Sequence, residues 1–160
     1  LADYWLSPSH RGTLPAPLIV GFGEAARIAA GEGLLDTGRI REQAGILLDG
    51  LKRAIPGLRL NGHPEARVPG NLNLTFPGGV DAQALMRAAP DLCVSTGSAC
   101  SSAEVAPSYV LKALGLADGE ARATLRIGLG RFTSPADAER AAASLAEAWR
   151  RVLPSSQAAA

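Results

Sequence analysis

The stretch Asn-Leu-Asn-Leu-Thr-Phe at residues 71–76 alternates polar and apolar side chains along its length. Successive side chains of a strand point to opposite faces of a sheet, so this alternation predicts a strand that is buried on one face and open on the other. Sheets with one open face are commonly antiparallel. The stretch therefore favours a small, mostly antiparallel sheet that helices cover.

Three further segments have the composition expected of strands in the same sheet. They are residues 58–61, 92–95 and 123–129. The last of these is apolar except where Arg126 interrupts it. Turn residues separate the segments, among them Pro77-Gly78-Gly79, which ends the alternating stretch.

Apolar residues recur at helical spacing in several segments between and around the strands. The expected helices span residues 18–30, 36–55, 82–88, 107–114 and 136–153. Gly31 and Gly33 are expected to separate the first two, and Asp81 is expected to cap the third. The fold class is therefore α+β, with an antiparallel or mixed small sheet covered by helices. We expect an irregular segment at 1–17, one domain at 18–153 and a disordered tail at 154–160.

The composition excludes several classes of protein. The 160 residues are 47% hydrophobic, which is enough for one ordinary core, and the formal net charge is only +1. Neither nucleic acid nor a membrane surface is therefore an expected partner, and no apolar run is long enough to span a bilayer. The 2 cysteines lie seven positions apart and do not suggest a disulfide framework, which favours a reducing cytoplasm.

The two cysteines have different surroundings. Cys93 follows Leu92 and precedes Val94, so it is expected to be buried at the end of a strand. Cys100 lies in a run of small and polar residues, Ser-Thr-Gly-Ser-Ala-Cys-Ser-Ser at 95–102, where its sulfur is expected to be reachable. Cys100 is the candidate nucleophile, and an incidental exposed cysteine is the alternative interpretation.

The remaining candidates are arginine and threonine side chains. The planar guanidinium of Arg126 suits a carboxylate, either of a ligand in a cavity or of an internal ion-pair partner, whereas Arg131 is expected to be structural. The Arg-Gly-Thr turn that contains Thr13 could hold a phosphate, although an ordinary loop is the default interpretation of so short a motif. No group of histidines and cysteines has metal-ligand spacing, so no metal site is expected.

Several segments together resemble one family. They are residues 12–15, 19–25, 95–102, 107–115 and 125–133, which occur in the same order as in that family. The chain resembles the C-terminal portion of the cysteine desulfurases, which are class V aminotransferases, in the group with a long active-site loop that serves iron–sulfur cluster assembly. The resemblance covers residues 11–153.

This resemblance implies a fold, an activity and site residues. The fold implied is the small C-terminal domain of the fold-type I pyridoxal-phosphate (PLP) transferases, usually homodimers. These enzymes take sulfur from L-cysteine, leave L-alanine and pass a protein-bound persulfide to a sulfur acceptor or cluster scaffold. Cys100 matches the thiol that takes the sulfur, Arg126 the arginine that holds the substrate carboxylate, and Thr13 a threonine that reaches the cofactor phosphate of the partner subunit.

The sequence also departs from the family. The family's cofactor lysine lies in an upstream context that neither Lys52 nor Lys112 shares, and His10-Arg11 stand where an arginine and a serine are usual. We recognise no resemblance to the family in residues 1–9. We therefore expect the isolated chain to be inactive. Two alternatives remain: a related PLP-dependent lyase, such as a selenocysteine lyase, and a non-catalytic persulfide carrier or interaction domain.

Overall fold

The computed structural model describes residues 15–96 and 108–153 of the chain. Contacts divide the chain into two compact units, Leu1–Leu35 and Asp36–Ala160, each of which is described by itself. None of the described helices is long and apolar enough to cross a membrane.

The first unit contains the start of helix α2, which spans Ala16–Ala54. The predicted break at Gly31 and Gly33 is wrong, because the helix runs through both residues. Neither glycine has a positive φ, the conformation that commonly ends a helix at glycine. A glycine inside a helix costs only about 1 kcal/mol relative to alanine, which does not by itself end a long helix. The helix also begins two residues earlier than predicted.

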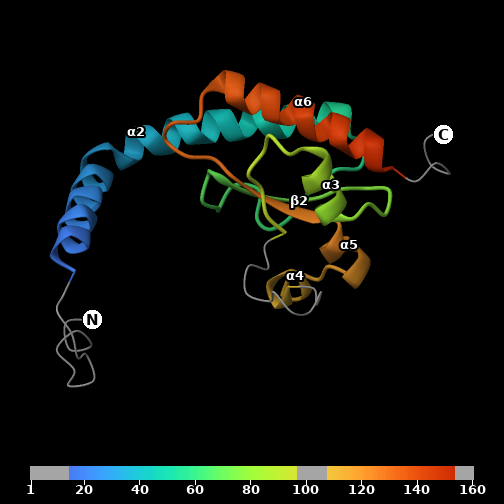
Figure 1. Ribbon diagram of the computed structural model, residues 1–160, viewed down its shortest axis with the longest axis horizontal. Coiled ribbons are helices and arrows are strands. Elements are labelled where there is room, and N and C mark those ends of the chain that lie inside the picture. The colour runs from blue at the N-terminus through green and yellow to red at the C-terminus, as the bar shows by residue number, and fades with distance from the viewer. Residues whose placement is uncertain (1–14, 97–107, 154–160) are drawn as a thin grey trace. The chain divides into compact units, whose positions relative to one another are not determined.

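Three antiparallel strands form the sheet of the second unit (Figure 1). They are β1 (Arg59–Leu60), β2 (Asn71–Thr75) and β3 (Thr124–Gly128), in the order β1-β2-β3. Leu72 and Leu74 of β2 are buried while Asn71 is exposed, so the alternation in the sequence predicted this strand correctly. The predicted strand at 92–95 is reduced to a single bridge between Ser95 and Arg126.

The described part of this unit contains four further helices. They are α3 (Ala82–Ala88), α4 (Tyr109–Ala113), α5 (Asp118–Arg122) and α6 (Pro135–Val152). Asp81 caps α3 as predicted, because its side chain accepts a hydrogen bond from the amide of Ala84 at 3.0 Å. Ser134 and Asp137 form a capping box at the start of α6. The sequence did not predict α5, which is a single short turn of helix.

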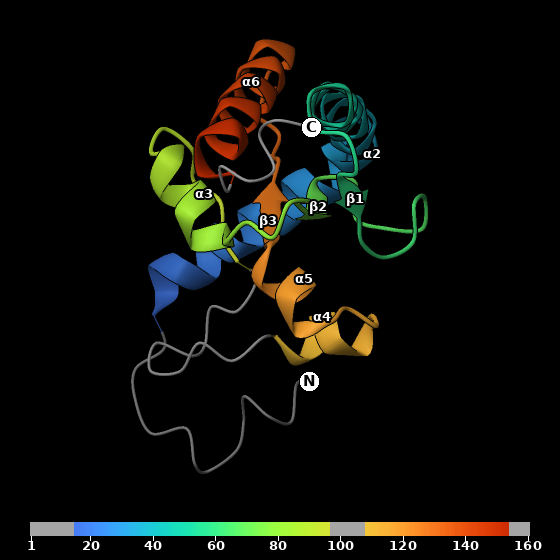
Figure 2. The same ribbon diagram turned by 90° about the vertical axis from the view of Figure 1, so that its right-hand side faces the viewer.

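The helices lie on two sides of the sheet. The last part of α2 and α6 run side by side along one face, while α4 and α5 lie on the other (Figure 2). The core lies between the sheet and the first pair of helices. Its most completely buried apolar side chains are Leu47, Leu51, Ile55, Leu74, Phe76, Leu85, Leu125 and Leu145.

Candidate functional site

The structure describes one of the three predicted site residues. Thr13 and Cys100 lie outside the described residues, so their roles stay predictions. Arg126 is the middle residue of β3 and its side chain is exposed. The candidate site therefore consists of Arg126 and the neighbouring side chains on the same face of the sheet.

That face carries the polar side chains of the sheet. On β3 the buried Leu125 and Ile127 alternate with Thr124, Arg126 and Gly128, so the strand is half-buried rather than wholly apolar. On β2 the residues paired with these three are Thr75, Asn73 and Asn71. The second face of the sheet therefore carries a row of polar side chains, a polar surface that is exposed at Arg126 and Asn71 and buried at Thr75 and Thr124.

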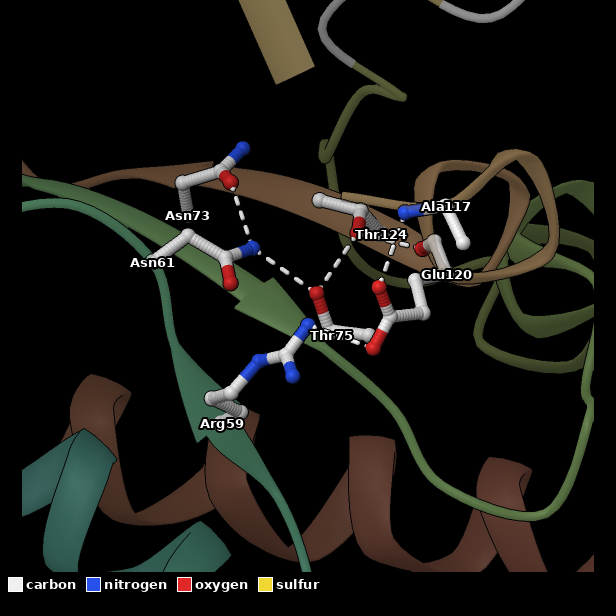
Figure 3. A network of polar contacts seen from close by, with 7 residues as sticks. All are labelled: Arg59, Asn61, Asn73, Thr75, Ala117, Glu120 and Thr124. Atoms are coloured by element: carbon white, nitrogen blue, oxygen red, sulfur yellow. Dashed lines mark hydrogen bonds and ion pairs between the residues drawn. The ribbon is translucent and has the colours of Figure 1, made fainter. Parts of the chain in front are cut away.

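A chain of hydrogen bonds crosses one end of this surface (Figure 3). The Thr124 hydroxyl donates to the backbone carbonyl of Glu120 at 2.7 Å and lies 2.8 Å from the Thr75 hydroxyl. Asn61 Nδ2 donates to Thr75 Oγ1 and to Asn73 Oδ1, both at 2.8 Å. Asn61, Thr75 and Thr124 are buried, so this network is part of the fixed interior.

An ion pair lies beside the network. Arg59 Nη2 donates to Glu120 Oε1 at 2.8 Å, and the backbone amide of Ala117 donates to Glu120 Oε2 at 2.9 Å. The hydrogen bond from the backbone amide of Ala117 is the largest cause that holds the pKa of Glu120 below its usual value, followed by the hydrogen bond from Arg59. The pair joins β1 to α5 and fixes the helix against the sheet edge.

The exposed guanidinium of Arg126 has no ion-pair partner among residues 15–96 and 108–153. The internal ion pair considered from the sequence is therefore not formed within this part of the chain. Its backbone bonds to Ser95 in both directions: Ser95 N–H donates to Arg126 O at 3.1 Å, and Arg126 N–H donates to Ser95 O at 2.6 Å. A solvent-facing, planar cation on a rigid strand can bind a carboxylate with two parallel hydrogen bonds.

The prediction that Cys93 is buried is wrong, since its side chain is exposed. The segment around it makes only one bridge to the sheet, at Ser95, so nothing turns Cys93 towards the core. Cys93 is one of the residues that line a cavity of about 330 Å³, together with its neighbours Leu92 and Val94, Ile127 of β3 and residues of α6.

Arg131 is structural, as predicted. Its Nε donates to Asp36 Oδ2 at 3.0 Å, and this pair joins the loop after β3 to α2. The hydrogen bond from Arg131 is the largest cause that lowers the pKa of Asp36, and Arg39 adds a smaller effect in the same direction.

The Asp36 ion pair predicts a specific dependence of stability on pH. Because the pKa of Asp36 is lower in the folded state, its contribution is complete above the unfolded pKa of about 3.9 and is lost as the pH falls through the folded value. We expect Asp36→Asn to lower the urea midpoint at pH 7 and to match the parent chain once the pH is well below 4. Asp49→Asn, an exposed change on the same helix, is the control. A midpoint difference that persists unchanged at the lowest pH would contradict the assignment.

The described residues do not by themselves provide a site for PLP. Attachment of the cofactor needs a lysine in an enclosed pocket. Lys112 lies on the surface and pairs with Asp118 at 3.2 Å, and Lys52 is exposed on α2.

The sequence predicted Arg126 as a site residue, but it did not predict the polar side chains that surround Arg126. Asn73 and Thr75 occupy alternate positions of β2, and this spacing alone places them on one face. What the sequence could not show is that Thr124 and Asn61, distant along the chain, complete the same network.

Comparisons with known proteins place the chain among related sequences. The profile of the class-V aminotransferases matches residues 7–141. The chain is 50% identical over 123 residues to the cysteine desulfurase IscS of Tolumonas auensis and 47% identical over 123 residues to that of Ehrlichia chaffeensis, in each case over 77% of this chain and 30% of the relative. It is 43% identical over 141 residues to the IscS of an Anaeromyxobacter species, over 88% of this chain and 35% of the relative.

Solved structures show the same fold. A NifS-like protein from Rickettsia africae superimposes with a TM-score of 0.71 at 26% identity, over 88% of this chain and 35% of that protein. DndA from Streptomyces lividans gives a TM-score of 0.55 at 37% identity, over 74% of this chain and 33% of that protein. The chain thus spans about a third of the length of these relatives.

Proposed function

Because this chain belongs to the class-V aminotransferase family and is similar to its cysteine desulfurases, we propose that it is the C-terminal part of a cysteine desulfurase. Dependence on PLP is a property of this family. In this proposal residues 18–153 form the small domain, and the cofactor is held mainly by a part of the protein that this sequence does not contain. L-cysteine and the Cys100 thiol give L-alanine and a Cys100 persulfide.

The contact between Ser95 and Arg126 carries this proposal. Two backbone hydrogen bonds, of 3.1 and 2.6 Å, fix Ser95 beside the arginine that would hold the substrate carboxylate. Cys100 follows five residues later, and an extended chain spans at most about 3.6 Å per residue. Connectivity therefore keeps the Cα of Cys100 within about 18 Å of Ser95. A thiol whose chain is anchored this close along the sequence to a carboxylate-binding cation suits attack on the sulfur of an amino-acid substrate.

The proposal also covers the cofactor phosphate, the sulfur acceptor, the location of the protein and the inactivity of the isolated chain. Thr13 reaches the cofactor phosphate of a partner subunit in a homodimer, and the persulfide passes to a sulfur-acceptor protein such as an iron–sulfur scaffold. The charge of +1 and the two cysteines support a cytoplasmic protein. The absence of a fitting lysine in the described part of the chain supports the proposal that the isolated chain is inactive.

A fusion protein tests this function. The chain is joined in frame to the preceding part of the Tolumonas auensis relative, and alanine and sulfide release from L-cysteine are measured with added PLP and a thiol reductant. We expect the fusion to release alanine and sulfide in equal amounts, and the isolated chain to release neither. The intact relative is the positive control.

Two results would contradict the proposal. A folded fusion that binds PLP but leaves L-cysteine unchanged would favour a carrier or interaction domain. A fusion that releases selenide from selenocysteine and no sulfide from L-cysteine would favour a selenocysteine lyase.

A further inference from the structure

We propose that Asn73 is a second ligand for the substrate carboxylate, beside Arg126, and that its amide is oriented by the buried network behind it. The inference rests on the proposed function, in which Arg126 holds the carboxylate of L-cysteine. It adds a binding residue to the polar face and gives the network of Thr124, Thr75 and Asn61 a positioning role.

The first argument is the pairing of the two strands. Asn73 and Arg126 are directly opposite each other on β2 and β3, so their side chains leave the same face of the sheet. Both backbone polar groups of Arg126 bond to Ser95, on the side away from β2. Asn73 and Arg126 therefore form a non-hydrogen-bonded pair, the kind in which opposite side chains come closest, with Cα atoms about 4.5 Å apart.

The second argument is the direction of the hydrogen bonds, which fixes the orientation of the Asn73 amide. The Thr124 hydroxyl donates its one hydrogen to the Glu120 carbonyl, so it must accept a hydrogen bond from Thr75. The one hydrogen of the Thr75 hydroxyl is thereby used, so Thr75 Oγ1 accepts a hydrogen bond from Asn61 Nδ2.

The other proton of that Asn61 amide goes to Asn73, which must present its oxygen. The NH₂ group of Asn73 is consequently directed away from Asn61, as Figure 3 shows. Within the described part of the chain, no hydrogen bond uses this NH₂ group.

The third argument is chemical complementarity. A carboxylate offers about four acceptor positions, of which the Arg126 fork can satisfy two. The neutral NH₂ group of Asn73 can donate to a third without cancelling the charge of Arg126, as an acidic residue at this position would. Because the supporting side chains are buried, the donor is oriented before the ligand arrives, which reduces the entropy lost on binding.

The test is a nuclear magnetic resonance titration of the ¹⁵N-labelled full chain with L-alanine, using L-alaninamide, which lacks the carboxylate, as the control ligand. We expect the side-chain signals of Asn73 and Arg126 to shift together with one Kd for L-alanine and to stay in place for L-alaninamide. Asn73→Ala should weaken binding about tenfold, or about 1.4 kcal/mol, and Asn71→Ala, on the same strand and face, should leave the Kd unchanged.

The outcomes separate this inference from the function on which it rests. If Arg126 responds to L-alanine while the Asn73 amide does not, or if Asn73→Ala binds as tightly as the parent chain, the role of Asn73 is wrong and that of Arg126 stands. If neither side chain responds, the carboxylate site itself is wrong. The titration of the parent chain decides between these results even if Asn73→Ala fails to fold.

Discussion

Replacing Cys100 by alanine in the fusion protein is expected to reduce the release of sulfide from L-cysteine by at least about a thousandfold. The proposed reaction transfers the substrate sulfur to this thiol, and alanine has no atom that can accept it. PLP binding should be unchanged, because no part of the proposed cofactor site depends on Cys100. The measurements are the rate of sulfide release and the absorbance of the bound cofactor.

Cys93→Ala is the matched control for this experiment. Cys93 is an exposed thiol seven residues earlier in the chain, and it has no place in the proposed reaction. We expect this variant to release sulfide at the rate of the parent fusion. Full activity of Cys100→Ala together with inactivity of Cys93→Ala would show that the nucleophile is Cys93 and not Cys100.

Arg126→Ala is expected to lower kcat/KM for L-cysteine by about a hundredfold. Hydrogen bonds to a charged group contribute about 1.5–3 kcal/mol each, and the upper end of this range corresponds to that factor. Arg126→Lys should recover only part of the loss, because a single ammonium cannot reproduce the two parallel bonds of a guanidinium.

Arg122→Ala controls for the loss of a positive charge near the same strand. Arg122 is the last residue of α5 and is exposed. We expect the Arg122→Ala variant to have the same kcat/KM for L-cysteine as the parent fusion. Equal losses for Arg122→Ala and Arg126→Ala would show that the effect is one of overall charge, which would contradict a specific carboxylate site.

Much of the fold followed from local sequence patterns. The alternation at residues 71–76 predicted β2 and its buried face, and Asp81 predicted the start of α3. The errors occurred where tertiary contacts or helix continuity override local signals. Gly31 and Gly33 did not end α2, and the apolar segment around Cys93 made only one bridge to β3.

The candidate site was predictable only in part. Arg126 stood out because a charged residue interrupts an otherwise apolar strand, and this signal is local. The orientation of Asn73 depends on a chain of hydrogen bonds through residues 61, 75 and 124, which only the register of three strands brings together. No spacing along the sequence contains that information. The network and the resulting donor therefore emerged only from the structure.

In the proposed reaction, Cys100 takes the sulfur of L-cysteine. The most direct measurement is peptide mass analysis of the fusion protein after reaction with L-cysteine and alkylation of its thiols, without a reductant. We expect one additional sulfur atom on the peptide that contains Cys100 and an equal amount of L-alanine in solution. Alanine formation with the additional sulfur on Cys93 or another residue, and none on Cys100, would contradict the proposed reaction.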